Sequence, residues 1–525
     1  MTLRSRAAPP LRSARASIRR FKSFRYWENA AGNQRILPLK IYEPSTLGEL
    51  IDIVQSAEHE GVTVRAVGSH HAWSDAALSA GYVIETHGLD RFLEIDDAKA
   101  DSSTENLIRV EAGIKLRAFN EQLLYGHRKA LLNMGGYDEQ TLGGVISTST
   151  HGSGVRFGPM CDFVASIDLV ASEGRCIRIE PTDGLTDPYA FHAKHPTWLL
   201  KQDDDWFHSA QVNIGCFGII YAVTIEVAPW YWLTERREIH NWTELEPQLR
   251  DRRVLNEHRH YEIYIDPYPT SGHSDRVCLV TTRDKNEVGP YEGLALERWR
   301  RNALTEFGLT IPLVRRIIVF LFATWPNWGP KLLARALRNL ERAEFTSHSF
   351  RVLNVGSANL LRVVCSEIAV PVDDRGTHIE AVHRLFQVAE LWRSQGRIYH
   401  AGHMSLRFVR ESPAFLSMMY GRPLTMMIEL FILHPIRGNE ELLSAYEDAL
   451  ADLGGRPHWG QFNRISGGHE MLIAMYPRFA DWQKIHRQLN ATGVFDSPMT
   501  KRIGFTHQGA LPEDGDDGPP IDRRP

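Results

Sequence analysis

Two glycine-rich stretches carry the residue types that could hold an anionic cofactor. The first, residues 64–75, reads VRAVGSHHAWSD, so an apolar run ends in Gly68 and Ser69 and is followed by His70 and His71. Glycine lacks a Cβ and tolerates positive φ, so such a turn lets the backbone approach a ligand. Successive N–H groups in the turn form a concave anion site that suits a pyrophosphate. The following imidazole would then lie beside whatever group carries the anion.

The second stretch, residues 132–154, reads LNMGGYDEQTLGGVISTSTHGSG. Two glycine pairs precede a run of hydroxyl side chains and a His-Gly-Ser-Gly tetrapeptide. Neither stretch fits the P-loop pattern G-x-x-x-x-G-K-[ST] or the dinucleotide fingerprint G-x-G-x-x-G. Two separate anion loops suit a long ligand with a central diphosphate.

These two stretches resemble the FAD loops of flavoproteins of the vanillyl-alcohol oxidase type, which carry a PCMH-type FAD-binding domain. Within that superfamily the chain is most similar to sugar-lactone oxidases (gulonolactone and arabinonolactone oxidases) and alditol oxidases. Their first loop reads Gly-Ser-x-His-Ser-Phe, with the flavin bonded through its 8α carbon to the His. His71 is therefore the flavinylation site that the resemblance implies, and Ala72 and Trp73 replace the Ser and Phe. The second loop matches the family pattern Thr-His-Gly-x-Gly at Thr150, His151, Gly152 and Gly154.

The resemblance implies FAD as the cofactor, bound covalently through His71. It assigns to FAD the two loops, a Gly-x-x-Gly-Ile segment and a His-Trp-Gly motif near the C-terminus. These residues are Gly68, Ser69, His70, His71, Trp73, Gly135, Gly136, Thr141, Gly143, Gly144, Ser147, Thr148, Thr150, His151, Gly152, Gly154, Gly218, Ile219, His458 and Trp459. Among them we expect His70 to be a bystander and His151 to be structural. Gly218 equally suits a tight helix-to-strand turn.

The substrate side of the family's site is a Glu-x-Arg pair on a strand and a Lys in a His-Trp-Gly-Lys motif. In this chain Ser405 replaces the Glu, Arg407 is kept, and Gln461 replaces the Lys. We therefore predict that Arg407 and Gln461 line the substrate site, with a surface Arg paired to an acid as the alternative for Arg407. A neutral Gln cannot supply the charge that a Lys supplies.

Two further acids, Glu367 and Glu429, are candidate bases because each lies inside an apolar strand pattern. A buried Glu is costly unless it is paired, so such a residue is a candidate for a raised pKa and a working role. For Glu367 we favour the solvent face of a half-exposed strand. For Glu429 both positions remain open, and strand alternation predicts that Ile428 and Leu430 face the opposite side.

Composition sets the general class. The chain has 525 residues, of which 43% are apolar and 24% charged, and its net charge is −4. These values are typical of a globular enzyme of two or more domains and give no reason to expect a nucleic-acid partner. Five scattered cysteines without a C-x-x-C pair argue against a disulfide framework or a zinc site and favour a reducing, cytoplasmic compartment.

The expected architecture is α+β: a PCMH-type FAD-binding domain of two α/β subdomains, and an α+β cap domain built on an antiparallel sheet. The boundaries we predict are a basic, disordered arm at 1–25, the FAD-binding domain at 26–230, the cap at 231–450, a C-terminal segment returning to the flavin at 451–511, and a disordered acidic tail at 512–525. A helix over 47–59 should start at Ser45 or Thr46 and end at Gly61.

In the cap, strands at 362–371, 404–410 and 425–433 and a helix at 376–394 predict the antiparallel sheet, after long helical stretches between 290 and 345. The apolar residues 317–325 are too few to span a bilayer, so we predict no transmembrane segment. They are expected to form a buried cap helix. The alternative is an interfacial segment in peripheral contact with a membrane, given the nearby Lys331, Arg335 and Arg338.

Taken together, the resemblance implies an FAD-dependent oxidoreductase that oxidises a CH–OH group of a small-molecule alcohol by hydride transfer to flavin N5. Dioxygen or another acceptor would complete turnover. The replacements at positions 405 and 461 leave open an FAD-linked tailoring oxidase acting on a less polar or natural-product substrate. A binding protein without turnover is the third alternative, and the retained glycine loops argue against it.

Overall fold

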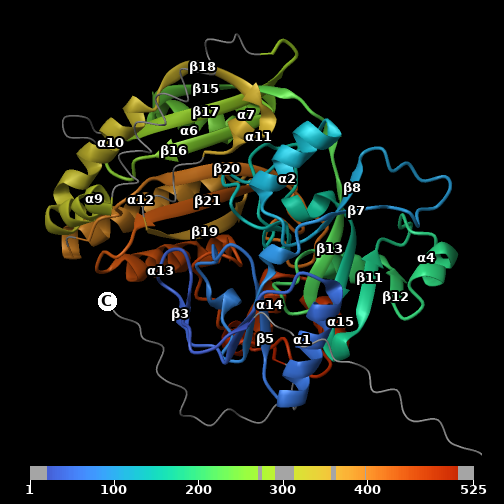
Figure 1. Ribbon diagram of the computed structural model, residues 1–525. Helices are drawn as coiled ribbons and strands as arrows, with labels where there is room; N and C mark the ends of the chain where they lie inside the picture. Colours follow the sequence, from blue (N-terminus) through green and yellow to red (C-terminus); the bar gives the residue numbers. More distant parts are fainter. Residues whose placement is uncertain (1–20, 270–274, 290–311, 356–361, 397, 507–525) are drawn as a thin grey trace, which may run out of the picture.

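The computed structural model describes residues 21–269, 275–289, 312–355, 362–396 and 398–506. The acidic tail and nearly all of the basic arm predicted at the two ends lie outside these residues, as does the part of the predicted helical stretch between 290 and 311. Three sheets organise the described chain, and in Figure 1 the largest of them lies above the first sheet and to the left of the second.

The first sheet has the strand order β1-β4-β6-β5, in which β6 pairs in parallel with both β4 and β5. Its strands are β1 (Phe21–Lys22), β4 (Lys40–Tyr42), β5 (Val64–Val67) and β6 (Tyr82–Glu85). Helix α1 (Leu47–Glu60) joins β4 to β5. The hydroxyl of Thr46 accepts the Glu49 N–H at 3.2 Å, and Gly61 ends the helix at φ 66°, which confirms the predicted boundaries. A small hairpin, β2 (Trp27–Glu28) and β3 (Arg35–Ile36), precedes β4.

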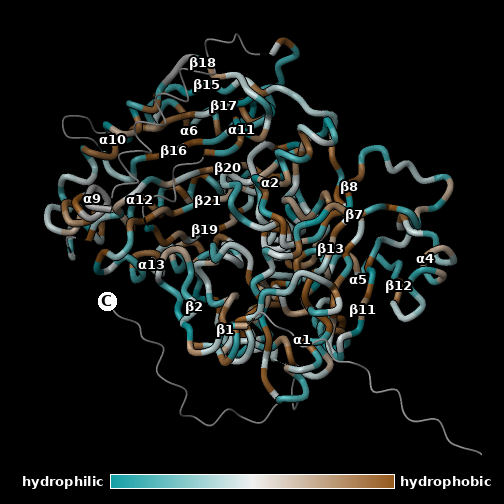
Figure 2. Tube along the Cα trace, in the orientation of Figure 1, coloured by the Kyte–Doolittle hydropathy of each residue, from teal (hydrophilic) through white to brown (hydrophobic). Residues whose placement is uncertain are grey.

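The second sheet has the order β12-β11-β10-β13-β8-β7. Its strands are β7 (Phe92–Leu93), β8 (Leu107–Glu111), β10 (Val164–Val170), β11 (Cys176–Glu180), β12 (Leu199–Gln202) and β13 (Ile219–Glu226). The same part of the chain contains four α-helices: α2 (Leu116–Gln122), α3 (Leu142–Ser147), α4 (Pro188–Lys194) and α5 (Asp204–Gln211). Strands β9 (Lys129–Ala130) and β14 (Ala228–Pro229) form a separate two-stranded sheet. Figure 2 shows the hydrophobic colour concentrated along its inner strands.

The third sheet, β18-β15-β17-β16-β20-β21-β19-β22, confirms the antiparallel cap. Its strands are β15 (Trp232–Asn241), β16 (His260–Ile265), β17 (Val277–Asn286), β18 (Arg342–His348), β19 (Val363–Pro371), β20 (Met404–Arg410), β21 (Leu424–Leu433) and β22 (Arg456–Pro457). Helices α6 (Trp242–Asp251), α7 (Arg253–Glu257), α12 (Thr377–Gly396) and α13 (Asn439–Leu450) share its hydrophobic core.

Two expectations for the cap are wrong. Residues from 342 onward form strand β18 at the sheet edge rather than helix, followed by the short helix α11 (Ser349–Leu353). The apolar helix α9 (Pro312–Thr324) is not buried, because Ile317 and Phe320 are exposed. Its neighbour α10 (Gly329–Asn339) packs on the sheet through Ala334 and Leu337, with Leu333 partly buried beside them, so this hairpin keeps an outer face.

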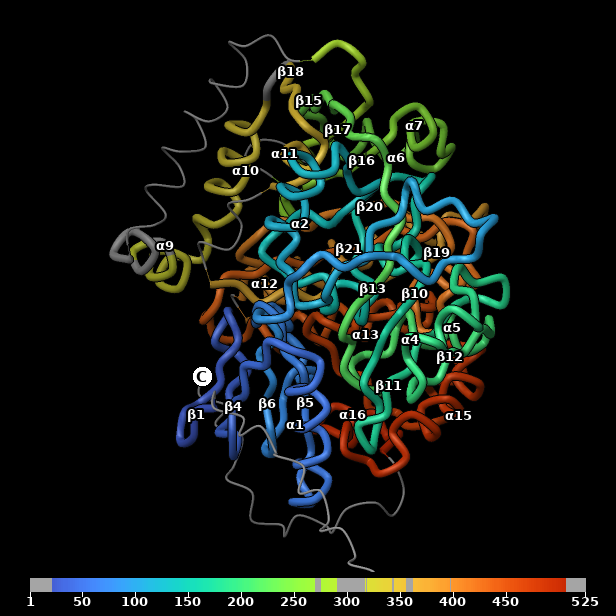
Figure 3. Tube along the Cα trace, turned by 45° about the vertical axis from the view of Figure 1, so that its right-hand side comes forward, coloured from blue at the N-terminus to red at the C-terminus, as the bar shows by residue number. Residues whose placement is uncertain are grey.

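The C-terminal segment joins the cap to the first two sheets. Strand β22 pairs with β19 of the cap sheet. Helices α14 (Gly468–Met475), α15 (Phe479–Leu489) and α16 (Pro498–Ile503) then pack into the core formed around the second sheet. In Figure 3 this red segment lies below the cap and beside the N-terminal sheets.

Arg65 is a charged residue inside the buried strand β5, and it ties three distant backbone segments together. Its guanidinium donates to the carbonyl of Ala76 at 2.8 and 2.6 Å, to those of Ile214 and Gly215 at 2.7 Å each, and to that of Phe495 at 3.3 Å. Ile214 and Gly215 both have positive φ (54° and 70°), so the guanidinium holds a turn that the chain would otherwise avoid.

We expect Arg65→Met to lower the free energy of unfolding by about 3 kcal/mol or more, because it leaves buried carbonyls without donors. Urea denaturation at neutral pH measures this loss. Arg35→Met, which removes an exposed guanidinium over the Tyr26 ring, is the control and should change stability by only about 0.5 kcal/mol. Equal losses of stability in the two variants would contradict the role of Arg65 in holding these backbone segments together.

Candidate active site

A cavity of about 460 Å³ lies between the two glycine loops and the antiparallel sheet of the cap. This volume is in the range of small-molecule sites. Its wall combines loop residues 65–73 and 135–151, the turn 213–220 and side chains of five cap strands. All four residues predicted to act on substrate, Arg407, Gln461, Glu429 and Glu367, line it.

The two glycine loops meet at Gly68. A Cβ built on Gly68 would lie 2.0 Å from the Oγ1 of Thr141, so only glycine permits this approach. His70 adopts φ 61°, which is uncommon for a residue with a side chain and marks a constrained turn. The hydroxyl of Ser69 is buried and has no hydrogen-bond partner among the described residues. A buried donor in a glycine-lined wall suits an anionic ligand.

His71 lines the cavity and packs edge-on against the ring of Tyr137, with 4.6 Å between centroids. Burial, together with the neighbouring His70, lowers the pKa of His71 to about 4. The imidazole is therefore neutral at physiological pH and keeps one ring nitrogen with a free lone pair. The His70 ring lies 5.1 Å from that of Trp27, and its Nε2 lies 3.6 Å from a carboxylate oxygen of Glu85.

Most residues predicted to hold FAD line this cavity: Gly68, Ser69, His70, His71, Trp73, Gly135, Gly136, Thr141, Gly143, Gly144, Ser147, Thr148, Thr150, His151, Gly218 and His458. Four do not: Gly152, Gly154, Ile219 and Trp459. A Cβ on Gly152 would meet the Oδ1 of Asn133 at 2.3 Å, and Gly154 (φ 111°) forms a bridge to Val409 of the cap. These two glycines thus serve the packing of the loop, while Trp459 is buried and donates to the carbonyl of Leu416.

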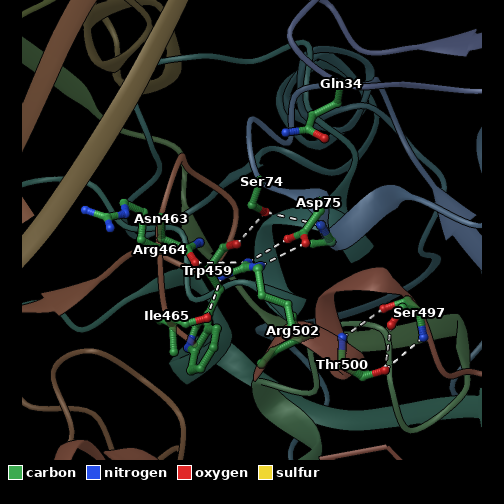
Figure 4. A network of polar contacts seen from close by, with 12 residues as sticks. Gln34, Ser74, Asp75, Trp459, Asn463, Arg464, Ile465, Ser497, Thr500 and Arg502 are labelled. Atoms are coloured by element: carbon green, nitrogen blue, oxygen red, sulfur yellow. Dashed lines mark hydrogen bonds and ion pairs between the residues drawn. The ribbon is translucent and has the colours of Figure 1, made fainter. Parts of the chain in front are cut away.

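The C-terminal motif is fastened to the first loop by backbone and side-chain contacts. The Ser74 hydroxyl donates to the carbonyl of Trp459 at 2.7 Å, and the Trp73 N–H donates to that of Gly460 at 2.9 Å. Arg502 of α16 pairs with Asp75 at 2.6 Å and also donates to the Ile465 carbonyl (Figure 4). Gln461, one residue beyond Gly460, is thereby held at the cavity wall.

Glu367 and Glu429 stand directly opposite each other on the neighbouring strands β19 and β21. The expected solvent position of Glu367 is wrong, because its side chain is buried and its Oε1 lies 3.1 Å from Nε2 of His151. Burial alone would favour the neutral acid, but His151 outweighs it and lowers the pKa of Glu367. His151, which belongs to the second glycine loop, therefore also contacts a carboxyl group of the cap.

The pKa of Glu429 shifts in the opposite direction. Burial raises the pKa of Glu429, and the carboxylates of Glu367 and Glu262 add to this rise. Arg407, whose guanidinium lies 3.2 Å from the Glu429 carboxyl, lowers this pKa but does not cancel the rise. As strand alternation predicted, Ile428 and Leu430 face away from the cavity into the hydrophobic core. The two acids thus have pKa values displaced in opposite directions, which is common where carboxyls do acid–base work.

Gln461 bridges the two acids. Its Nε2 lies 3.4 Å from an oxygen of Glu367 and 3.4 Å from one of Glu429. Its Oε1 is buried and has no hydrogen-bond partner in the described part of the chain. This oxygen can accept a hydrogen bond from a hydroxyl bound in the cavity.

Arg407 is the central cation of a buried ladder rather than a surface residue. Its Nε donates to Glu262 at 2.7 Å, while Arg283 contacts both Glu262 at 3.0 Å and Glu235 at 2.9 Å. Although burial favours the neutral acid, Arg407 and Arg283 lower the pKa of Glu262 to about 2. Positive and negative groups therefore alternate from β15 across the sheet to Glu429.

Sequence reasoning missed several side chains of the cavity wall. Tyr264, His403 and Phe431 form a ring stack with centroid distances of 4.5 and 5.1 Å. Burial lowers the pKa of His403 to about 4, so this stack carries no charge at neutral pH. One signal was available for Glu262, the partner of Arg407: a single acid inside the apolar strand HYEIYI.

Two family descriptions match the chain. Residues 38–180 match an FAD binding domain, and residues 223–503 match D-arabinono-1,4-lactone oxidase over more than half of the 525 residues. The L-gulono-1,4-lactone dehydrogenase of Mycobacterium tuberculosis is 26% identical over 479 residues, which cover 91% of this chain and 98% of that protein. The L-gulonolactone oxidase of Mus musculus is 24% identical over 488 residues, with the same coverage of 91% and 98%.

Solved structures with the same fold include a solvent-stable cholesterol oxidase, with a TM-score of 0.71 and 14% identity over 91% of this chain and 97% of that one. The cholesterol oxidase from Brevibacterium sterolicum has a TM-score of 0.69 and 13% identity over 91% and 96%. At this identity the likeness shows the fold alone.

Fold and site together define an FAD-dependent oxidoreductase with a PCMH-type FAD-binding domain. The chain belongs to the D-arabinono-1,4-lactone oxidase family. The residues of the cavity fit FAD, because two close-approach glycine loops and a buried, unpartnered serine hydroxyl line one wall. The family match does not favour a tailoring oxidase for a less polar substrate.

We expect Arg407→Met to lower the free energy of unfolding by about 3–5 kcal/mol, because Glu262 and Glu429 lose their shared cation while staying buried. Urea denaturation at pH 7 measures the change. Arg236→Met, which breaks an exposed pair with Glu344 in the same sheet, should cost less than about 1 kcal/mol. A loss for Arg407→Met as small as that of the control would contradict the ladder.

Proposed function

We propose that this protein oxidises a CH–OH group of a sugar lactone, with Glu429 as the acceptor of the hydroxyl proton. The observation that carries the proposal is the position of Glu429 in a cavity lined by the FAD loops, between Arg407 at 3.2 Å and Gln461 at 3.4 Å. A polyhydroxylated ring needs several donors and acceptors close together, and these three side chains supply both.

Each side chain has a role that follows from its contacts. Arg407 is fixed by Glu262, so its guanidinium can hold an oxygen of the substrate in a constant position. Gln461 donates to both carboxylates and offers its free Oε1 to a second hydroxyl. The contact with His151 lowers the pKa of Glu367, whereas the pKa of Glu429 is raised, so Glu429 is the acid whose proton affinity is raised.

Bound FAD supplies the acceptor for the hydride that leaves the carbon as the hydroxyl proton is lost. The protein contributes the base and the orientation. A general base contributes roughly 10²–10⁴ in rate, and it works best when its pKa is close to the working pH. A raised pKa of Glu429 favours this function.

His71 is the residue through which FAD would be bonded to the protein. It follows Gly68 and Ser69 with only His70 between, and its imidazole is neutral, which a nucleophilic nitrogen requires. Tyr137 packs against the ring and restricts its orientation.

We expect the purified wild-type protein to keep its yellow colour in the pellet after acid precipitation, and His71→Ala to release FAD into the supernatant. Mass spectrometry of the peptide that contains His71 should show the added mass of one FAD. His70→Ala is the matched control and should retain the flavin in the pellet. Release of all FAD from wild type would refute the covalent bond, while the proposed oxidation would stand.

We expect Glu429→Gln to lower kcat by roughly 10²–10⁴-fold with little change in KM, because it removes the proton acceptor while keeping the shape of the site. In wild type, kcat/KM should fall as the pH drops through the pKa of Glu429, because only the carboxylate accepts a proton. That pKa is raised, so the fall should lie above the ordinary range of a glutamate. Steady-state assays with sugar lactones measure both effects.

Gln461→Lys is the companion variant. An ammonium between the two carboxylates would stabilise their charged forms and lower the pKa of Glu429. The acid limb should therefore move to lower pH. An unchanged limb in Gln461→Lys, together with normal turnover in Glu429→Gln, would assign the base to another residue.

A further inference from the structure

The helical hairpin α9–α10 presents an exposed apolar surface at the outer edge of the cap. Four large side chains dominate this surface: Ile317 is 47% exposed, Phe320 59%, Trp325 44% and Trp328 53%. Trp325 and Trp328 stack with 5.7 Å between ring centroids, and Phe320 meets Trp325 edge-on at 6.1 Å. The aromatic rings therefore form one continuous patch rather than scattered contacts.

The same hairpin is strongly basic. Lys331, Arg335 and Arg338 are exposed along α10, and the sequence from 312 to 340 contains five basic residues and no acidic residue. The chain as a whole has a net charge of −4, so this surface differs in sign from the rest of the molecule. An aromatic patch next to a row of cations complements the interfacial region of an anionic bilayer.

The packing of the hairpin leaves this face outward. Ala334 and Leu337 of α10 bury against Val277 and Leu279 of β17, which fixes the opposite side of the helix on the sheet. In Figures 1 and 3 α9 and α10 lie at the edge of the cap, far from α4 and the second sheet. Among the described residues no helix is long and apolar enough to cross a membrane.

We propose that the α9–α10 hairpin docks the protein on the surface of an anionic lipid bilayer, with Trp325 and Trp328 inserted at the headgroup level and the α10 cations against lipid phosphates. Leu340, which follows α10, lines the active-site cavity. Docking through this hairpin therefore places the membrane beside one wall of the active site. The proposal does not depend on the identity of the substrate.

Co-sedimentation of the full-length protein with phosphatidylcholine vesicles, with and without phosphatidylglycerol, tests this proposal. Wild type should bind the vesicles that contain phosphatidylglycerol, and binding should weaken as salt is added. Trp325→Ala/Trp328→Ala and Lys331→Gln/Arg335→Gln/Arg338→Gln should each reduce the partition constant more than tenfold, since one cation near such a surface is worth roughly fivefold. Tyr125→Ala/Tyr189→Ala removes two exposed aromatic residues elsewhere and should bind as wild type does.

A second measurement needs no variant. Brominated lipids should quench part of the tryptophan fluorescence of the wild-type protein, because two indoles enter the headgroup region. Absence of vesicle binding by the wild-type protein would overturn the proposal. So would binding and quenching that are reduced neither by the double tryptophan variant nor by the triple variant of the cations. Concentration-dependent dimerisation in light scattering that the tryptophan variant abolishes, without vesicle binding, would assign the patch to a second copy of this chain instead.

Discussion

The burial of Arg407 beneath the cavity constrains the whole cap. A guanidinium in this position requires carboxylates, and Glu262 and Glu429 provide them from the strands on either side. Arg283 then balances Glu262, and Glu235 balances Arg283, so the ladder continues to strand β15. A shift of one residue in any of these strands would turn a charged side chain into the hydrophobic core on the other face. The ladder therefore fixes the register of the sheet that forms the substrate side of the site.

Two features bring that sheet to the cofactor side. His151 of the second glycine loop pairs with Glu367, and Gly154 of the same loop forms a bridge to Val409. The C-terminal segment closes the arrangement, because β22 pairs with the cap while Arg502 anchors the following turns to Asp75 beside the first loop. The proposed base Glu429 thus owes its position to long-range contacts, and burial raises its pKa first, with a smaller contribution from the carboxylates of Glu367 and Glu262.

The features that depend on local sequence could be predicted, whereas those that depend on contacts between distant segments could not. Thr46 and Gly61 mark the ends of α1 by their own chemistry, and alternation placed Ile428 and Leu430 opposite Glu429. The solvent position expected for Glu367 failed because the side chains that contact its carboxyl, His151 and Gln461, come from segments distant in sequence. The burial predicted for residues 317–325 was wrong. A hydrophobic run predicts a helix with an apolar face, but it does not tell whether a surface of the sheet is available to cover that face. Gly152 and Gly154 resemble ligand-binding glycines in sequence, but close backbone approach within the loop explains them.

The central claim is that FAD lies between the two glycine loops with its reactive ring beside Glu429 and Arg407. A crystal structure of the purified protein soaked with a sugar lactone tests this most directly. The account predicts the diphosphate against residues 68–71 and 135–150, and a lactone hydroxyl within hydrogen-bond distance of Glu429. A diphosphate bound elsewhere, or a lactone that contacts neither Glu429 nor Arg407, would contradict it.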